Sequence, residues 1–193
     1  LQADLLSEHQ QLLKISTQLA STNKDLHKIA LTDVLTGLPN RRAAMDSLEH
    51  QWALAKRGDR VLSCMMVDID HFKSINDKFG HPVGDITLQH VATSLAQSAR
   101  AQDLVCRIGG EEFLVICPDS SIEATYQCAE RLRQNVMALL IPNEGNVPIR
   151  ITVSIGVAAS VEKIASVQEL LSLADKHLYA AKQAGRNRTV VRG

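Results

Sequence analysis

The sequence predicts an α+β domain in which a central, mainly antiparallel sheet is flanked by helices. After a first long helix, stretches with helical periodicity and short apolar stretches follow in the order α-β-α-β-β-α-β-α-β. Two apolar runs flank Gly109-Gly110, which predicts a tight antiparallel hairpin whose two-residue turn has the positive φ that Gly adopts without strain. The 193 residues are enough for one such domain with a good core and an appendage.

Residues 1–30 are predicted to form one helix that pairs as a coiled coil, and residues 31–193 the folded domain. Apolar residues form two rows at heptad spacing, interrupted by Glu8 and Thr22 in the second row. The rows are Leu5, Leu12, Leu19 and Leu26, and Leu1, Ile15 and Ile29. The alternative is an amphipathic helix packed on its own domain. The absence of Gly and Pro and the polar residues away from the seam favour the coiled coil.

The first half of the domain begins where Gly37 and Pro39 break the helix. Asn40 is placed to cap a helix over 41–56, which Gly58-Asp59 ends. A continuous apolar run over 61–67 predicts a buried central strand that closes in Asp68-Ile69-Asp70. A loop is expected over 71–84, after which Asp85 caps a helix that runs to about Ala99.

The second half starts with the hairpin, which Pro118 and Asp119 end. The remaining elements are expected as a helix over 121–140, a loop over 142–148, a strand over 149–159, a helix over 167–184 and a short last strand over 189–192. Gly185 closes the last helix, at a position where Gly is common.

Charge and cysteine usage exclude several classes of protein. The formal net charge is zero, so no general field recruits nucleic acid or a membrane surface. The four cysteines form no CxxC pair, which indicates buried reduced thiols in a cytoplasmic domain rather than a zinc site. No apolar run approaches the roughly 20 residues of a membrane helix. Because the chain starts at Leu1 rather than Met, we expect a fragment whose upstream part could be membrane-bound.

Acidic residues mark the ends of two predicted strands: Asp68 and Asp70 close one, and Glu111 and Glu112 open another. If these strands are neighbours, up to four carboxylates gather at one end of the sheet, which is costly unless a cation neutralises them. Hard oxygen ligands without His or Cys point to Mg²⁺ or Mn²⁺, and hence to a metal-dependent phosphoryl or nucleotidyl transfer. The alternative is that Asp68 or Asp70 only caps the next turn.

Gly-Gly-Glu-Glu-Phe at 109–113 resembles the signature of the GGDEF-domain diguanylate cyclases. Further motifs match in order over about residues 31–190: Asp-Val-Leu-Thr-Gly-Leu-Pro-Asn-Arg-Arg at 33–42, Asp-Ile-Asp-His-Phe-Lys-Ser-Ile-Asn-Asp at 68–77, Gly-His-Pro-Val-Gly-Asp at 80–85, Thr-Val-Ser-Ile-Gly at 152–156 and Ala-Asp-Lys-His-Leu-Tyr-Ala-Ala-Lys-Gln-Ala-Gly-Arg-Asn at 174–187. The resemblance implies a palm-like nucleotidyl cyclase fold and the synthesis of cyclic di-GMP from two GTP, with release of two pyrophosphates.

The resemblance also implies roles for the acidic residues. Asp68, the carbonyl of Ile69 and Glu111 would hold Mg²⁺, with Glu112 beside them. Either Glu112, or Glu111 through the metal, would help to deprotonate the attacking 3′-hydroxyl, and the sequence does not separate these two roles. Lys73 would stabilise charge on the triphosphate.

For the substrate, the resemblance implies a guanine pocket and a phosphate clamp. Asn76 and Asp85 match the family's guanine readers, with His81 nearby, since a carboxylate suits the N1–H and amino group of guanine. Phe72 is expected among the residues that bind the substrate. Lys182 and Arg186 would contact phosphate, and their i, i+4 spacing lets them share a helix face. Favourable placement of cations at a helix C-terminus is the alternative. Residues 154–156 are expected to be structural.

Arg100-Ala-Gln-Asp103, directly before the hairpin, is similar to the family's inhibitory product site, and Arg131 could supply a second arginine. A surface ion pair is the alternative. Since the product is made from two GTP, two domains must face each other, and the resemblance together with the coiled coil predicts a homodimer through residues 1–30. Two other functions stay open: a non-catalytic receptor that binds cyclic di-GMP or GTP, and a cyclase that makes a mixed dinucleotide.

Overall fold

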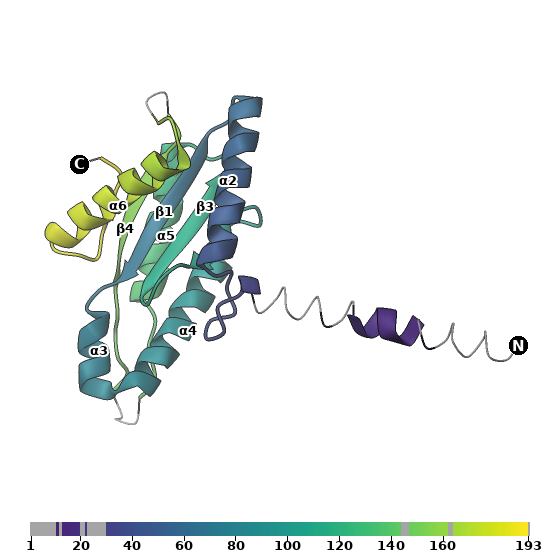
Figure 1. The fold of residues 1–193 in the computed structure, drawn as a ribbon. Helices are drawn as coiled ribbons and strands as arrows, with labels where there is room; N and C mark the ends of the chain where they lie inside the picture. The colour runs from purple at the N-terminus through teal and green to yellow at the C-terminus, as the bar shows by residue number, and fades with distance from the viewer. Residues whose placement is uncertain are drawn as a thin grey trace, which may run out of the picture.

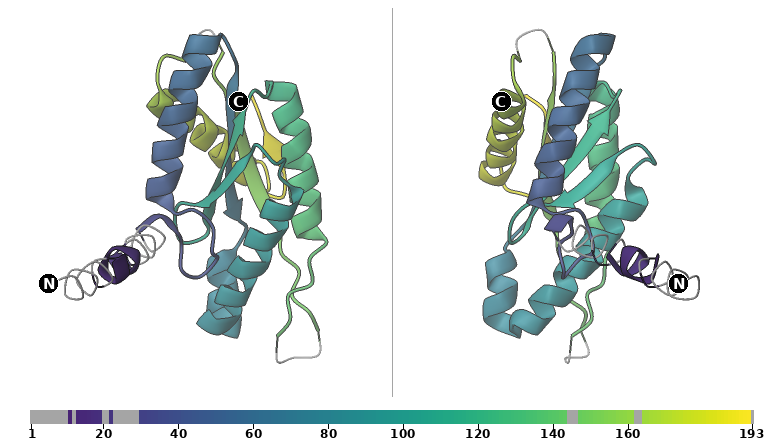
Figure 2. Two further views of the ribbon diagram at one scale, coloured as in Figure 1. Left: turned by 90° about the vertical axis from the view of Figure 1, so that its right-hand side faces the viewer. Right: turned by 45° about the vertical axis from the view of Figure 1, so that its right-hand side comes forward.

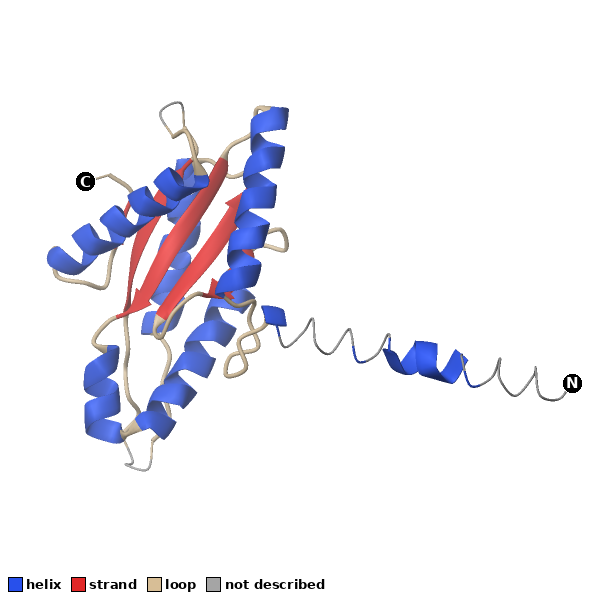
Figure 3. Ribbon diagram, in the orientation of Figure 1, coloured by secondary structure: helices blue, strands red, loops and turns tan. Residues whose placement is uncertain are grey.

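The computed structural model describes residues 11, 13–19, 22, 30–143, 147–161 and 164–192. The domain is α+β, as predicted, with a sheet of five strands in the order β2-β3-β1-β4-β5 (Figures 1 and 3). The elements are α2 (Arg41–Gly58), β1 (Leu62–Ile69), α3 (Phe72–Phe79), α4 (His81–Ser98), β2 (Leu104–Arg107), β3 (Glu112–Pro118), α5 (Ile122–Met137), β4 (Val153–Ala159), α6 (Val167–Gln183) and β5 (Thr189–Val190).

The strand β1 is the centre of the sheet and is buried along its whole length. It pairs antiparallel with β3 on one side and with β4 on the other, while β2 continues the sheet beyond β3. Only the short β5 pairs in parallel, with β4. Such a buried strand requires cover on both faces, which explains why its sequence is a continuous apolar run rather than an alternating one.

Helices cover both faces of the sheet (Figure 2). Met65 and Val67 of β1 join a core with α4 and α5, whereas Cys64 and Met66 point the other way and join a core with α2 and α6. Since side chains alternate along a strand, Asp68 continues the row of Cys64 and Met66 and lies on the face that α6 covers.

The helix boundaries agree with the sequence signals at several ends. Asn40 caps α2 as predicted, with its Oδ1 accepting from the amide of Ala43 at 3.1 Å. Asp59 ends that helix in the left-handed conformation, with a φ of 49°. Ser121 and Ser166 cap α5 and α6. The strand expected over 149–159 begins later, at Val153.

The loop expected over 71–84 is wrong. Residues 72–79 form α3, and α4 begins at His81, so Asp85 lies inside that helix and is not its N-cap. Phe72 and Ile75 are buried at helical spacing, and this packing stabilises a short helix whose polar residues alone suggested a loop. The two helices meet at Gly80, whose φ of 84° separates them.

The predicted hairpin is present, but the prediction that Gly109 and Gly110 adopt positive φ in a two-residue turn is wrong. The strands end at Arg107 and resume at Glu112, so the connection is residues 108–111, hereafter the GGEE loop. Neither Gly109 nor Gly110 is among the glycines of positive φ in the described part of the chain, which are Gly37, Gly80 and Gly185. The lack of a side chain at Gly109 instead leaves room for the side chain of Glu112, because a Cβ at Gly109 would lie 2.7 Å from Oε2 of Glu112.

The cysteines are buried and free, as expected. Burial raises the pKa of the Cys64 and Cys106 thiols to about 12 each, so both stay protonated at neutral pH. Among the helices in the described part of the chain, none is both long and apolar enough to cross a membrane.

The predicted N-terminal helix is described only in part. Residues 11, 13–19 and 22 are helical, whereas Leu1, Leu5, Leu12, Leu26 and Ile29 lie outside the described residues. Ile15 and Leu19 of the predicted seam are 58% and 67% exposed in the single chain. These two residues of the seam are therefore mainly exposed in the described part of the single chain.

Candidate active site

Acidic residues from β1 and β3 meet at one end of the sheet, as the sequence predicted. Asp68 lies directly opposite Glu112 in the antiparallel pair, so both side chains are on the same face. Glu111 precedes β3, and its carbonyl accepts from the amide of Ile69 at 3.3 Å. The backbone of Ile69 and Glu111 and the carboxylates of Asp68 and Glu112 are thereby held together.

Burial and mutual repulsion act on these carboxylates. Burial raises the pKa of Asp68, and the charges of Glu112 and Asp70 raise it further, while Lys182 opposes the shift. Burial also raises the pKa of Glu111, with Asp68 as the second cause. The ionised form of both carboxyls is therefore destabilised by burial and repulsion, and a cation placed between them would stabilise that form.

One cation already contacts the acidic residues at this end of the sheet: Nζ of Lys182 lies 2.8 Å from Oδ2 of Asp68. Lys182 belongs to α6, which lies unusually close to β4. A Cβ at Gly156 would overlap the carbonyl oxygen of Ala174 and the amide nitrogen of Leu178, so only Gly permits this approach. Gly156 therefore has the structural role that was expected: it lets α6 pack close to β4, and α6 carries the Lys182 ammonium to the acidic residues.

Asp70 does not join the acidic residues as a free ligand. Its buried carboxylate accepts hydrogen bonds from the hydroxyls of Thr152 and Ser154 at 2.6 and 2.7 Å, and from the amide of Asn187 at 3.0 Å. Asp70 thus joins the end of β1 to β4 and to the turn after α6. Sequence reasoning considered capping for this residue, but these partners are more than 80 residues away in sequence.

The expectation that Lys182 and Arg186 share a helix face is wrong. The helix α6 ends at Gln183, and Arg186 has a φ of 63° in the turn that follows. Gly185, with a φ of 112°, ends the helix before Arg186 is reached. The Lys182 ammonium is still held at the end of β1 by Asp68, and the backbone of the turn that contains Arg186 is held there by the hydrogen bond from Asn187 to Asp70.

The residues expected to read guanine lie on α3 and α4. Asn76 and Phe72 contact Gly84, where a Cβ would overlap Oδ1 of Asn76 and lie 3.3 Å from Cζ of Phe72. Gly84 therefore sets the position of the Asn76 amide. Lys73, His81 and Asp85 are exposed on the same helix pair.

The described residues contain no group of three or more His, Cys, Asp or Glu side chains arranged to hold a metal ion. Mg²⁺ does not require one, because it is usually bound by one or two carboxylates and completes its shell with water and substrate phosphate. Asp68, Glu111 and the carbonyl of Ile69 offer hard oxygen donors, and burial, together with neighbouring carboxylates, raises the pKa of both carboxyls. This donor set fits Mg²⁺ or Mn²⁺.

Comparison with known proteins identifies the family. Residues 30–188 match the family model described as diguanylate cyclase, GGDEF domain. The chain belongs to this family. It is 42% identical over 164 residues to the response regulator PleD of Caulobacter vibrioides, covering 84% of this chain and 36% of PleD. It is 44% identical over 168 residues to the diguanylate cyclase DgcP of Pseudomonas aeruginosa, covering 87% of this chain and 25% of DgcP.

A solved structure agrees with the fold over nearly the whole chain. The coiled coil and GGDEF domain of DgcB from Caulobacter crescentus, in complex with c-di-GMP, matches with a TM-score of 0.92 and 30% identity. The match covers 97% of this chain and 99% of that one. The neighbour includes a coiled coil, in agreement with the fold class predicted from the sequence. Against the full-length relatives, however, this chain spans about a third or less of PleD and DgcP.

In this GGDEF domain, the turn predicted as an inhibitory site precedes β2. The amide of Arg100 donates to Oδ2 of Asp103 at 2.9 Å, and the other oxygen of Asp103 is buried without a hydrogen-bond partner. Arg131, from α5, donates to the carbonyl of Ser98 at 3.0 Å and so lies beside the turn. The structure therefore brings Arg131 to the Arg100–Asp103 turn, which sequence spacing alone did not establish.

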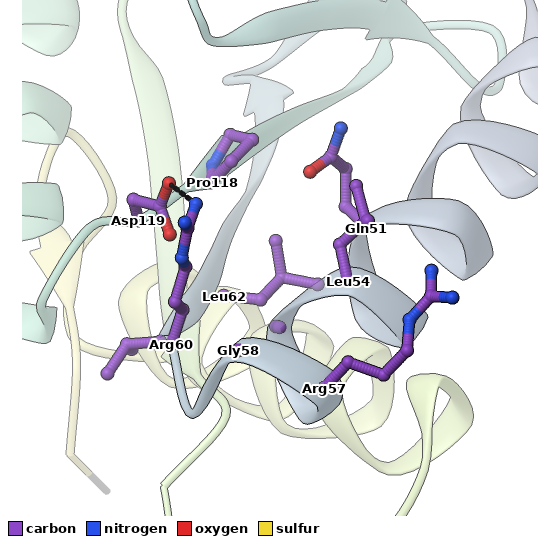
Figure 4. A pocket seen from close by; sticks show the side chains of 10 residues that line it. Gln51, Leu54, Arg57, Gly58, Arg60, Leu62, Pro118 and Asp119 are labelled. Carbon is purple, nitrogen blue, oxygen red and sulfur yellow. Dashed lines mark hydrogen bonds and ion pairs between the residues drawn. The ribbon is translucent and has the colours of Figure 1, made fainter.

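The pocket in Figure 4 lies at the other end of the sheet. It is lined by Gln51, Leu54, Arg57 and Leu62 among others, where β1 begins and β3 ends. Within it, Arg60 and Asp119 form an exposed ion pair at 3.1 Å. The GGDEF domain thus has its acidic site at the opposite end of β1 from this pocket.

Proposed function

We propose that this domain is a diguanylate cyclase, which condenses two GTP into cyclic di-GMP and releases two pyrophosphates. One observation carries the proposal: Asp68 and Glu112 face each other across two strands beside Glu111, with the Lys182 ammonium 2.8 Å from Asp68. In this arrangement neighbouring carboxylates repel Asp68 while the Lys182 ammonium attracts it. The chain is also a member of the diguanylate cyclase family. The arrangement suits the binding of a magnesium triphosphate better than a structural salt bridge alone.

The metal ligands we propose are Asp68, Glu111 and the carbonyl of Ile69, with Glu112 beside them. A bound Mg²⁺ or Mn²⁺ would supply Lewis acidity that lowers the pKa of the attacking 3′-hydroxyl. Either Glu111 or Glu112 would accept the proton of that hydroxyl, since Glu111 directly precedes β3 and Glu112 is its first residue.

Cations and polar residues around the acids would bind the rest of GTP. Lys182, from α6, and Arg186, from the turn after it, would contact phosphates, and Lys73 would stabilise the charge that develops on the triphosphate. Asn76 and Asp85 would read the guanine edge, with Phe72 and His81 close in sequence on the same helix pair. The contact between Asn76 and Gly84 supports this assignment, since a reader must be held in position.

A homodimer follows from the proposed reaction. One domain has one set of acidic residues, whereas the product joins two GTP, so each of two facing domains would present its 3′-hydroxyl to the other's α-phosphate. The exposed Ile15 and Leu19 support pairing through the N-terminal helix, since a second helix would bury them. The DgcB structure, which contains a coiled coil, is in line with this expectation.

Product inhibition at Arg100, Asp103 and Arg131 is part of the same proposal. The unpartnered Asp103 oxygen supports it, because a buried acceptor without a donor suits a ligand N–H. Arg131 beside it would contact a phosphate or the guanine edge. DgcB was crystallised in complex with c-di-GMP, the ligand that this site would hold.

The test is to incubate the purified chain with GTP and Mg²⁺ and to identify the products by mass spectrometry. We expect cyclic di-GMP and pyrophosphate in a ratio of one to two. Asp68→Asn and Glu111→Gln should each lower the rate at least about a hundredfold, because each removes a charged ligand, while the fold survives the relief of crowding. Asp119→Asn, at the far end of the sheet, is the control.

Two outcomes would contradict the proposal. Near-parental activity in either acidic variant would exclude the metal assignment. Binding of GTP or cyclic di-GMP by the parent without any product would identify a receptor instead of an enzyme, and a mixed dinucleotide would identify a cyclase of different specificity.

A further inference from the structure

A single guanidinium joins two loops that are far apart in the sequence. Arg107 is the last residue of β2, and its Nε and Nη2 donate to the carbonyl oxygen of Gly110 at 3.2 and 2.7 Å. Its Nη1 donates to Oδ1 and Oδ2 of Asp33 at 2.9 and 3.1 Å. One end of this contact is therefore the GGEE loop, and the other is the segment that precedes α2.

That segment, the linker loop (residues 32–40), is itself tightly bonded. Asp33 accepts from the amide and hydroxyl of Thr36 at 2.9 and 2.6 Å, which shapes the loop around its carboxylate. At the end of the loop, the carbonyl of Pro39 accepts from the amide of Arg107 at 2.9 Å. Arg107 thus contacts the linker loop through both its side chain and its backbone.

The linker loop is also fixed to the helices on either side of it. Asn40 donates from its amide to the carbonyl of Leu31 and from its Nδ2 to that of Ala30, each at 2.9 Å, and both acceptors are helical residues. Its Oδ1 caps α2. The preceding helix end, the linker loop, α2 and the GGEE loop therefore form one continuous set of hydrogen bonds.

Burial makes the Asp33–Arg107 pair more than a surface ion pair. The side chains of Arg107 and Asp33 are only 13% and 24% exposed. Although burial by itself would raise the pKa of Asp33, hydrogen bonds from Thr36 and Arg107 outweigh it and lower that pKa. A charged carboxylate orients Arg107 in two bonds, and the same planar group presents its other donors to Gly110.

We propose that Arg107 and Asp33 are positioning residues for the reaction: Arg107 holds the Gly110 peptide, and so sets the placement of Glu111, while Asp33 holds Arg107. This inference rests on the proposed function of Glu111. Gly110 is the residue before Glu111, and Gly has no side chain to fix its own peptide, so the loop needs an external contact. The hydrogen-bond partner of the Gly110 carbonyl lies on a strand, which is a rigid support for it.

The experiment compares Asp33→Asn and Arg107→Lys with the parent. Asp33→Asn keeps the size of the side chain but removes the charge that orients Arg107. A lysine at 107 lacks the planar guanidinium, whose separate edges bond Asp33 and Gly110 at the same time. We expect kcat to fall about tenfold in each variant, with KM for GTP changed by less than about twofold, because misplacement of a reacting group affects the chemical step. Hydrogen exchange measured by mass spectrometry should become faster in the GGEE loop of Asp33→Asn, although Asp33 lies outside that loop.

The matched control is Asp119→Asn, which breaks the Arg60–Asp119 pair at the other end of the sheet. It should leave kcat and exchange in the GGEE loop unchanged. Parental kcat in both test variants, or faster exchange confined to the linker loop, would overturn the inference. If the parent makes no cyclic di-GMP, the proposed function fails, and the exchange measurement still decides whether Asp33 holds the GGEE loop through Arg107.

Discussion

At the scale of single residues, two glycines and one aspartate control the geometry of the site without carrying its chemistry. Gly84 sets the position of Asn76, Gly156 allows α6 to approach β4, and Asp70 fixes the turn that contains Arg186. Each acts on a residue that the sequence motif assigns to the substrate. Substitutions at these positions therefore test the site indirectly, without deleting the proposed contact itself.

Gly84→Ala should impair recognition of guanine. The added Cβ would overlap Oδ1 of Asn76, so the amide has to move, and KM for GTP should rise about tenfold with weaker discrimination against ATP. Helix propensity favours Ala by about 1 kcal/mol, so a loss of binding would not come from a weaker helix. Steady-state kinetics with both nucleotides measure the effect. Unchanged selectivity in a folded variant would show that Asn76 is not a guanine reader.

Residue-scale prediction from the sequence was strongest where the motif carries the chemistry. Asp68 and Glu112 were expected to meet, and they are cross-strand partners. Arg107 was not singled out, although it is the only charged residue in the strand Leu104–Arg107. A charge in an apolar strand is a weak signal, because its partner, Asp33, is distant in sequence and only the fold brings the two together.

At the scale of elements, the packing of α6 on β4 determines where Lys182 lies. Gly156→Ala would put a methyl group against the backbone of Ala174 and Leu178, and backbone cannot rotate away as a flexible side chain can. We expect the free energy of unfolding to fall by about 1–3 kcal/mol. The activity should fall as well, because a displaced α6 withdraws Lys182 from Asp68. Urea denaturation and initial rates measure the two effects.

Gly58→Ala is the control for both glycine variants. The atoms nearest to a Cβ at Gly58 would belong to the side chain of Arg60, the first at 3.2 Å, and that side chain can move. Its stability should change by no more than about 0.5 kcal/mol. If Gly156→Ala were equally neutral, the close approach of α6 would not depend on the glycine.

The elements that the sequence missed were short or depended on tertiary contacts. The helix α3 has 8 residues, too few for a convincing periodic pattern, and it is held by burial of Phe72 and Ile75. The helix end near Gly185 was predicted, but the shared helix face expected for Lys182 and Arg186 was wrong, because Arg186 lies beyond Gly185 with a positive φ. The contact of this turn with Asp70 depends on the end of β1 and is not visible in the sequence. Long helices with polar caps, such as α2 and α5, were predicted closely.

At the scale of the whole molecule, the proposed reaction requires two copies. Replacing Leu12 and Leu19 by Asp should give monomers, because charges in an apolar seam prevent pairing. Activity should then survive only at high protein concentration, since two loaded domains must meet by diffusion. Analytical ultracentrifugation and rates measured over a dilution series give the two readouts.

The control for the coil carries the same charges outside the seam, as Gln10→Asp with Thr17→Asp, two positions seven residues apart in the sequence. It should remain dimeric and active. Full activity of the Leu12 and Leu19 variant at dilutions where only monomer sediments would exclude a role for the coil.

The central place of β1 also bears on how the chain folds during synthesis. Ser63 of β1 pairs with Cys117 on one side but with Ala159 on the other, and β4 is made long after β1. Until β4 leaves the ribosome, the nascent sheet exposes one unpaired edge of β1, which is buried along its whole length in the finished domain, and such a state is prone to aggregation. A chain stalled or truncated before Val153 would therefore be a substrate for chaperones rather than a smaller version of the domain.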